Sequence, residues 1–563
     1  MGKGASLNAL RLLLPWLSRH RRHLAGAVAL AVVTMLAGIG LFSVAGWFLT
    51  GAFLAGASMA FDLFAPSALV RGLSFLRIGS RYAERVVGHA ATLELLADIR
   101  TAVFARIMAL SPVQLAGYRD GDLVARLIGD IDALDTMFLL IVAPVLTALT
   151  IGLAFGLVLG VYAPLLAGAV LAALLVGIAV VPYCLARASR RPGAQAQASA
   201  SETRALIHDA VAGHADIAAF GAQERIAAQF HQAALRLSKA RDRVAAIAAR
   251  GQFAQQIVIG ACVLALLWLG LLALRAGAMT GPVWVGMLLG GVGLFEVLGP
   301  LMRGASRMGA TAEGARRVHA VFAARPAIVQ AALACDLPLS GTLALDGASY
   351  RYGAAGPLVL DRVDLRIAQG ERVAILGASG QGKSTLLSLL LRVVDPVQGS
   401  VSFGGVDLVR ANLDQLHARV ALLSQFSPVF LGSVRANLLI GDAQASDDRL
   451  WQALEQARLA RFVRGLPDGL DTWVGESGGS LSVGQARRLC LARTLLAPAR
   501  VWVLDEPTAG LDEETKTGFF RDLARVAGER TVILATHADF PPGVFHRVFH
   551  LRRGVLQEAG QAV

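Results

Sequence analysis

The sequence is short of charge and of aromatic side chains. Only 17% of its 563 residues are charged and 6% are aromatic, whereas 55% are hydrophobic. With a mean hydropathy of +0.57, a chain of this length is too long for one domain and too apolar for an ordinary soluble protein. Part of the chain is therefore expected to lie in lipid.

Cysteine is also scarce, and the few cysteines are scattered. They stand at Cys184, Cys262, Cys335 and Cys490 and form no CxxC pair. This spacing indicates neither a zinc site nor a disulfide framework. No basic motif with interleaved aromatic side chains is present, so nucleic acid is not an expected partner despite the net charge of +13.

Arginine supplies most of the positive charge, and it gathers beside apolar runs. Arg19, Arg21 and Arg22 precede the run that begins at Leu24. The cytoplasmic flanks of membrane helices are basic in this way, because anionic lipid attracts them. We therefore expect residues 6–23 to form a basic amphipathic helix on the membrane surface, with lipid as its partner.

Several uncharged runs are long enough to cross a membrane, which takes about 20 apolar residues per helix. The run over 24–61 is much longer than the apolar core of a signal peptide, so we interpret it as a retained segment with a span over 24–48. The run over 137–186 predicts two spans joined by a tight turn at 162–164. Two further spans are predicted over 251–274 and 283–301.

The second span is the one that hydropathy supports least. It is predicted to begin near Asp62, although Arg71, Arg77 and Arg81 lie within it. We include it because the number of spans must be even if both termini are cytoplasmic. The total is then six spans.

The rest of the chain predicts helical extensions and a second domain. The charged segments 85–136 and 187–250 have helical composition and are expected to project into the cytoplasm. A membrane domain is expected at 1–318, a linker at 319–338 and a separate domain at 339–563, where strands, turns and helices alternate.

The second domain contains a full match to the P-loop pattern. A short apolar strand over 373–376 leads into Gly377, Ala378, Ser379, Gly380, Gln381, Gly382, Lys383 and Ser384, with Thr385 next. The glycines let backbone N–H groups surround phosphates, the lysine adds a point charge, and the serine hydroxyl reaches Mg²⁺. Lysine occurs at only four positions in the chain, which makes a chance match improbable.

A second apolar strand ends in two carboxylates. Residues 501–504 are followed by Asp505 and Glu506. Together with the P-loop, this pattern predicts that Asp505 holds Mg²⁺ and that Glu506 polarises the water that attacks the γ-phosphate. The predicted fold is a membrane α-helical bundle of six spans fused to a cytoplasmic α/β P-loop ATPase domain, with ATP and Mg²⁺ as its ligands.

Other segments resemble those of ATP-binding cassette (ABC) ATPases. Residues 481–485, which include Ser482, Gly484 and Gln485, resemble the family signature. The remaining matches are Gln425 for the Q-loop, 510–512 for the D-loop, His537 for the switch histidine, Tyr352 for the ring under adenine, and Thr472, Val474, Gly475, Glu476 and Gly478 for the contact with the partner's coupling helices. The resemblance implies that Gln425 contacts Mg²⁺ and that Gln425 and His537 serve hydrolysis.

The resemblance also implies a partner. ABC ATPase domains close head to tail, so each ATP lies between one P-loop and the opposite signature, and one chain cannot complete a site. Val483 stands where the family has glycine, and a β-branched side chain restricts a loop that must approach phosphate closely. We therefore predict that the site using Val483 is the weaker one. Such asymmetry favours a heterodimer, with a homodimer as the alternative.

The membrane half resembles the CydC family of exporter subunits. The resemblance rests on Gly40, Leu41, Ser43, Gly46, Trp47, Phe48, Val70, Arg71, Gly72, Arg77, Gly79, Arg81, Tyr82, Glu84, Arg85, His89, Phe295, Glu296 and Pro300. It implies a CydD-like partner in the bacterial inner membrane and export of cysteine or glutathione in support of cytochrome assembly. Haem is an alternative ligand or cargo.

A stripe of cations suggests where cargo binds. Arg77, Arg81, Arg85 and His89 recur every four residues and lie along one helical face. Cations at membrane depth are costly, so Arg71 and Arg77 are expected to face a polar cavity or a carboxylate such as that of Glu296.

Two interpretations of the stripe stay open, and one alternative function remains. Arg71, Arg77, Arg81 and His89 could bind an anionic cargo, with His89 able to ligate haem iron. The lower part of the stripe could instead be the cytoplasmic end of the helix. A lipid or multidrug half exporter is a further alternative, against which the cationic stripe argues.

Overall fold

The computed structural model describes residues 15–559 apart from 17, 57–60, 119–122, 124–125, 133–136, 332, 354, 476–480 and 509–512. The chain divides into two compact units. The helical unit comprises residues 1–109 and 116–325, and the sheet unit comprises 110–115 and 326–563. A helix continues through Ala323, so the first residues of the segment expected as a linker are helical.

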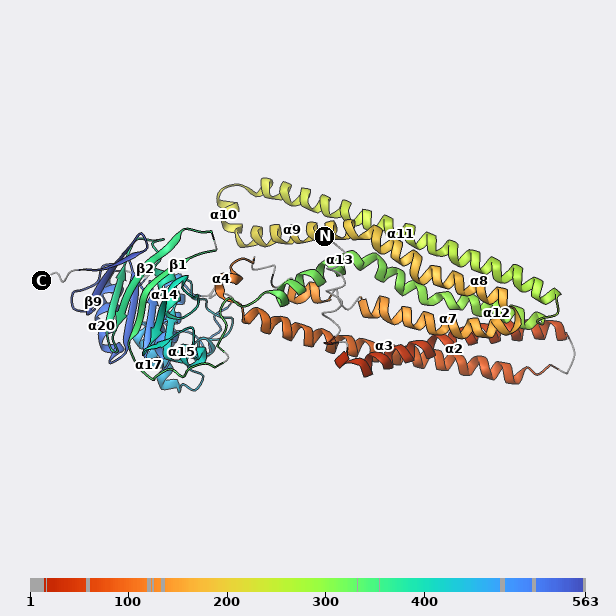
Figure 1. Ribbon diagram of the computed structural model, residues 1–563, viewed down its shortest axis with the longest axis horizontal. Coiled ribbons are helices and arrows are strands. Elements are labelled where there is room, and N and C mark those ends of the chain that lie inside the picture. Colours follow the sequence, from red (N-terminus) through yellow and green to blue (C-terminus); the bar gives the residue numbers. More distant parts are fainter. Residues whose placement is uncertain are drawn as a thin grey trace. The chain divides into compact units, whose positions relative to one another are not determined.

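Long helices run side by side in the helical unit (Figure 1). They are α2 (Arg21–Ala55), α3 (Phe64–Met108), α7 (Ala143–Tyr162), α8 (Pro164–Leu175), α9 (Val181–Ala212), α11 (Gln223–Arg275), α12 (Gly281–Leu294) and α13 (Leu298–Ala323). Shorter pieces connect or extend them: α10 (His214–Ala219), η1 (Arg126–Asp130), η2 (Phe138–Val142), η3 (Val176–Val180) and η4 (Phe295–Val297). The tight turn predicted at 162–164 is present, since Ala163 is extended between α7 and α8.

Five helical stretches in the described part of the chain are long and apolar enough to cross a membrane. They are Arg21–Ala55, Phe138–Tyr162, Pro164–Ala212, Gln223–Arg275 and Gly281–Ala323. Helix α3 is not among them, because its arginines lower its hydropathy. It is nevertheless 45 residues long and packs along α2, so it adds a sixth long stretch to these five in the described part of the chain. Most of the surface helix predicted over 6–23 lies outside the described residues.

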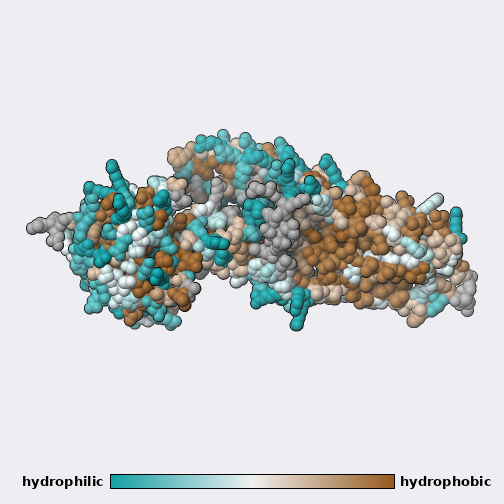
Figure 2. Space-filling model, in the orientation of Figure 1, coloured by the Kyte–Doolittle hydropathy of each residue, from teal (hydrophilic) through white to brown (hydrophobic). Residues whose placement is uncertain are grey.

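The surface of the helical unit changes character along its length. Figure 2 shows hydrophobic side chains covering the part formed by α7, α8 and α12, and hydrophilic ones over α9 and the first half of α11. Large apolar side chains such as Leu153, Val161, Leu165 and Trp268 are exposed in the apolar part. In water such a surface would be costly, so we interpret it as the lipid-facing belt of the bundle.

Glycines allow helices to pack backbone against backbone. A Cβ placed on Gly286 of α12 would lie 2.7 Å from the carbonyl oxygen of Ser43 in α2, and one on Gly46 would lie 2.9 Å from that of Val285. Small residues make such close approach possible, and close packing drives helix association in lipid.

The sheet unit contains two sheets. The six-stranded sheet has the order β10-β9-β3-β8-β7-β6, and the four-stranded antiparallel sheet has the order β2-β1-β4-β5. The strands are β1 (Leu343–Arg351), β2 (Leu358–Ile367), β3 (Arg372–Leu376), β4 (Gln398–Phe403), β5 (Val406–Asp407), β6 (Val420–Leu423), β7 (Val501–Asp505), β8 (Thr531–Thr536), β9 (Arg547–Arg552) and β10 (Val555–Glu558).

Helices flank these sheets. They are α4 (Pro112–Leu115), α14 (Lys383–Leu390), α15 (Leu413–Arg419), α16 (Val434–Leu439), α17 (Asp447–Gln456), α18 (Ala460–Arg464), η5 (Gly469–Asp471), α19 (Val483–Leu496) and α20 (Glu513–Ala527). Strands β7 and β8 are buried at every residue, as is typical of parallel strands covered on both faces. Because β3, β7 and β8 are parallel neighbours, their carboxyl ends meet at one edge.

Candidate functional site

The P-loop joins the end of β3 to the start of α14. Gly380 and Gly382 have φ values of +81° and +101°, which side chains larger than hydrogen rarely tolerate. Nζ of the buried Lys383 donates to the carbonyl oxygens of Gly377 and Ala378 at 2.6 and 3.3 Å. The loop therefore curls around a buried cation at a helix N-terminus, an arrangement that suits a phosphate anion.

Ser384 and Asp505 meet beside the P-loop. The Ser384 hydroxyl donates to Asp505 Oδ2 at 2.6 Å, whereas the buried Oδ1 has no hydrogen-bond partner among the described residues. Burial raises the pKa of the Asp505 carboxyl above its usual range. A buried carboxylate oxygen without a partner is costly unless a cation approaches it. The pair therefore fits the oxygen ligands that Mg²⁺ prefers.

Glu506 lies at the centre of a small polar cluster. Its Oε1 is 2.8 Å from His537 Nδ1 and 3.6 Å from Lys383 Nζ, and its Oε2 accepts from the Thr536 hydroxyl at 3.2 Å. Its φ of +51° is uncommon for a residue with a side chain and costs on the order of 1–3 kcal/mol. Glu506 is buried, while 71% of the His537 side chain is exposed. The carboxylate is thus held in place behind an exposed imidazole.

The signature segment forms the start of α19. The Ser482 hydroxyl accepts from the Gln485 N–H at 3.2 Å, and the Ser482 N–H donates to Gln485 Oε1 at 2.8 Å. This capping box fixes the first turn. Val483 is the first residue of that turn, and 83% of it is exposed. The turn that contains Val483 and Gly484 is therefore rigid and open to a partner.

The sheet unit also places the other residues that the sequence indicated. Tyr352 follows β1, is 48% exposed, and its hydroxyl lies 2.9 Å from Thr385 Oγ1 in α14. Gln425 is exposed in the turn after β6. The carbonyl oxygen of Thr472 accepts from the Val434 N–H at 3.1 Å. Residues 510–512, Glu476 and Gly478 lie outside the described residues.

Arg487 is a residue that the sequence analysis missed. It is buried in α19, and its guanidinium donates to the carbonyl oxygens of Ser424 and Gln425 at 2.5 and 2.7 Å. It also donates to the carbonyl oxygens of Asp505 and Glu506, the latter at 3.0 Å. The backbones of the Q-loop and of the carboxylate pair are thereby tied together. Its only sequence signal is its place two residues after Gln485.

The helical unit contains a cavity of about 1120 Å³ that is lined mainly by α3, with further residues from α2, η2, α7, η4 and α13. Its ionisable lining residues are Arg77, Arg81, Glu84, Arg85, His89, Glu296 and Arg303. Glu296 lies in η4, where its carboxylate accepts from Arg77 at 2.5 Å and from Arg81 at 3.3 Å. The cavity thus has four arginines against two glutamates, a net charge of +2 when His89 is neutral.

Arg71 lies outside this cavity. Its Nε donates to the carbonyl oxygen of Ser67 at 3.4 Å, and the residue is exposed. Arg71 lies six positions before Arg77, so its side chain points about 120° around the helix away from the stripe. Arg77 instead crosses Gly38 of α2, whose added Cβ would lie 3.2 Å from the Arg77 Nε.

Comparisons with known proteins agree with both units. Residues 360–509 match the ABC transporter family, and residues 66–290 match the ABC transporter transmembrane region. A solved bacterial Atm1-family ABC exporter with ATP bound shares this fold, with a TM-score of 0.83, 22% identity and coverage of 95% of this chain and 94% of that one.

Two curated relatives cover almost the whole chain. One is the glutathione/L-cysteine transport system ATP-binding/permease protein CydC of Escherichia coli K12, 30% identical over 98% of this chain and 97% of that protein. Another is the corresponding CydD protein of Bacillus subtilis 168, 27% identical over 93% of this chain and 91% of that protein. The chain therefore belongs to the CydC family of ABC exporters, multi-pass membrane proteins that use ATP and Mg²⁺ and couple ATP hydrolysis to transport.

Proposed function

We propose that this chain is one half of an exporter that moves a thiol reductant, cysteine or glutathione, from the cytoplasm to the periplasm in support of cytochrome assembly. A CydD-like chain in the bacterial inner membrane would be its partner. The observation that carries the proposal is the cationic cavity bounded by Arg77, Arg81 and Glu296. The Escherichia coli relative is named as a glutathione/L-cysteine transport protein, which supports the choice of cargo.

The proposed chemistry at the P-loop follows from charge and position. Mg²⁺, held by Ser384, Asp505 and Gln425, would neutralise phosphate charge when bound. Lys383 would exchange its two carbonyl partners for phosphate oxygens. Glu506 would orient and polarise the attacking water, and His537 would hold the Glu506 carboxylate from its solvent side.

The remaining nucleotide contacts are proposed on the same basis. Tyr352 is half-exposed at the end of β1 and would stack under adenine. The P-loop residues Gly377, Ser379, Gly380, Gly382 and Thr385 would surround the phosphates of ATP bound to this chain. Ser482, Gly484 and Gln485 belong to the exposed first turn of α19 and would contact ATP held by the partner.

The charge of the cavity matches the proposed cargo. Glutathione carries two carboxylates and one ammonium group, and cysteine carries one of each, so a carboxylate is the anionic group that both share. Guanidinium groups bind carboxylates through paired hydrogen bonds, and Arg81 is only loosely paired at 3.3 Å. A cargo carboxylate would therefore engage Arg81 and His89, while Glu296 stays on Arg77. The cavity volume slightly exceeds the range of about 300–1,000 Å³ typical of ligand pockets, which leaves room for water.

The two alternative cargoes have less support. His89 lines the cavity, but neither the CydC nor the CydD relative is named for haem. A lipid or multidrug exporter would need an apolar cavity to hold an acyl chain or an aromatic drug. The four arginines of this cavity would have to be desolvated to admit such a cargo, and that desolvation is costly.

The test is the ATPase rate of the complex with its partner in lipid, titrated separately with glutathione, cysteine, haem and a lipid. Arg81→Gln and His89→Ala are the test variants. Arg71→Gln is the matched control, since it removes an exposed arginine of the same helix outside the cavity. We expect a thiol to stimulate hydrolysis, the test variants to lower that stimulation at least tenfold, and basal turnover to persist.

Two outcomes would contradict the proposal. If only haem or only lipid stimulated hydrolysis, that compound and not a thiol would be the cargo. If Arg71→Gln and Arg81→Gln lowered the stimulation equally, the cavity would not be the site that recognises cargo.

A further inference from the structure

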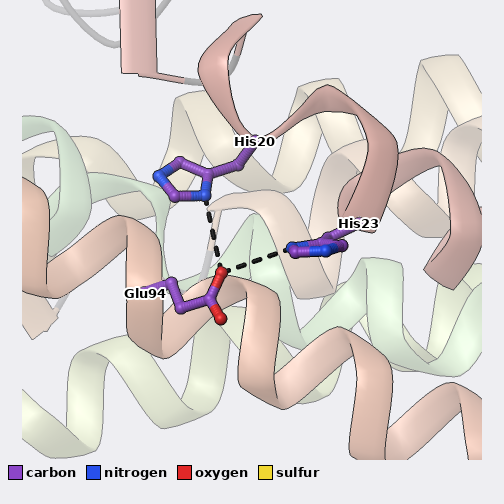
Figure 3. Close-up of side chains that lie close together, drawn as sticks. All are labelled: His20, His23 and Glu94. Carbon is purple, nitrogen blue, oxygen red and sulfur yellow. Dashed lines mark hydrogen bonds and ion pairs between the residues drawn. The ribbon is translucent and has the colours of Figure 1, made fainter.

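We propose that His20, His23 and Glu94 form a binding site for a divalent transition-metal ion of the zinc class (Figure 3). His20 precedes α2, His23 lies in its first turn, and Glu94 lies on α3. None of the three lines the cavity of the helical unit. The site would therefore be separate from both the cargo cavity and the nucleotide.

The spacing of the ligand atoms suits such an ion. Glu94 Oε2 lies 3.6 Å from His20 Nδ1 and 3.3 Å from His23 Nδ1. The three ligand atoms all lie within 4.8 Å of one another. Tetrahedral zinc, with bonds of about 2.0–2.1 Å to nitrogen and oxygen, separates its ligands by about 3.3 Å. Small side-chain rotations would close the set around an ion, because both imidazoles already face Glu94 (Figure 3).

A fourth residue orients one ligand. Asp98, one turn after Glu94 on α3, places its Oδ2 3.0 Å from His20 Nε2. When Nε2 donates its proton to this carboxylate, Nδ1 of a neutral His20 is left with a free lone pair. Carboxylate–histidine pairs of this kind hold metal-binding imidazoles in one tautomer and raise their basicity. Asp98 Oδ2 also lies 3.9 Å from a guanidinium nitrogen of Arg19.

The same geometry is poorly satisfied without a cation. With its proton on Nε2, a neutral His20 directs the lone pair of Nδ1 towards the carboxylate oxygen of Glu94, and two acceptors then face each other. A metal ion between them converts this repulsion into two bonds. The competing arrangement is a protonated His20 that donates to both Asp98 and Glu94, which would be an ion-pair cluster only.

The exposure of the three side chains would let a metal ion reach the site from water. The side chains of His23 and Glu94 are 63% and 53% exposed, so an ion can enter from water and keep a water molecule as its fourth ligand. The His20 side chain is 14% exposed, so one ligand is held within the protein. Bound metal would cross-link the start of α2 to the middle of α3.

The experiment measures Zn²⁺ bound by the full-length chain, without a polyhistidine tag, by equilibrium dialysis and elemental analysis. We expect one zinc ion that His20→Ala, His23→Ala or Glu94→Gln weakens at least tenfold. Asp98→Asn should weaken it about tenfold, as loss of an outer-shell partner does. His231→Ala, which removes an exposed histidine of α11, and Cys335→Ser, which removes an exposed thiol, should leave this ion bound.

A second measurement on the unaltered chain makes the test independent of variant folding. Co²⁺ in place of Zn²⁺ should give the intense visible absorption of a tetrahedral nitrogen and oxygen site. Absence of that absorption, or zinc binding that the His20→Ala/His23→Ala double variant leaves unchanged, would overturn the proposal and leave an ion-pair cluster only.

Discussion

Glu506 joins three elements of the sheet unit at one carboxylate. Glu506 directly follows strand β7, and Lys383 of the P-loop lies near one of its carboxylate oxygens. Thr536 and His537, at the end of β8, each contact one of the two oxygens. Its left-handed backbone is fixed by an N–H bond to the Ala535 carbonyl oxygen at 2.8 Å. A strained residue persists only where its surroundings determine it, so its position should matter for function.

Glu506→Gln should therefore abolish most hydrolysis and retain nucleotide binding. The amide keeps the size and one acceptor of the side chain but loses the charge that polarises water, and removal of such a group costs about 10²–10⁴-fold. The ATPase rate and nucleotide affinity of the complex measure the two effects. Glu529→Gln, at an exposed position before β8, is the control. Equal losses in both variants would argue against a direct role of Glu506.

Arg487 should stabilise the backbone around the same carboxylate. Arg487→Met leaves four carbonyl oxygens, two of them in buried hydrogen bonds, short of a charged donor, at a cost on the order of 2 kcal/mol. Hydrogen exchange in β7 and in the turn at Gln425 should become roughly thirtyfold faster, as mass spectrometry of the intact chain would show. Arg410→Met removes an exposed arginine and should not change exchange there. Unchanged exchange in Arg487→Met would contradict the inference.

Individual residues differ in how far the sequence could predict them. The P-loop and the Asp505–Glu506 pair are local patterns, so spacing alone indicated their chemistry. Arg487 acts on carbonyl groups 62 and 63 residues earlier in the chain, and no local pattern reveals such contacts. Arg71 was grouped with the cavity arginines by charge, but the helical period places it on another face of α3.

Helices α2 and α12 approach each other closely because glycines lie at their contact. Gly286 meets the backbone of α2 directly, so Gly286→Val would force the two helices apart at a cost of about 1–3 kcal/mol. The thermal unfolding temperature of the complex in lipid should fall accordingly. Gly260→Val is the matched control, because a Cβ there meets nothing within 4 Å. Equal effects of the two substitutions would show that general helix properties, not this contact, are responsible.

Elements were predictable where hydropathy or strand patterns are strong. Apolar runs indicated α2, α7, α8, α11 and α12, and the turn at 162–164 followed from Pro164. Helix α3 could be included only by counting spans, because its arginines hide it from hydropathy. Their cost is offset by Glu296, which lies on a different element and is invisible to a local pattern. The sequence likewise could not predict which glycine packs against which helix.

For the whole molecule, the exposed Val483 predicts unequal ATP sites in the complex. The β-branched side chain stands on a capped, rigid turn, so it cannot easily withdraw from a phosphate held by the partner. Glu506→Gln should then remove nearly all ATP turnover, whereas the equivalent change in the partner should leave a substantial part of that turnover. Single-turnover ATPase assays of the two singly altered complexes measure this. Equal losses would indicate equivalent sites, and Val483→Gly should raise the partner site's contribution.

The ion pair between Arg77 and Glu296 has a consequence for how the protein is made. The two residues are 219 positions apart, and synthesis at about 5–20 residues per second separates their appearance by roughly 10–40 seconds. During that interval α3 carries arginines whose carboxylate partner has not yet been made. Because unpaired cations are costly in lipid, we expect α3 to stay in contact with water or lipid head groups until η4 emerges. Interrupting translation between these points should trap a nascent chain in which α3 remains accessible to aqueous reagents.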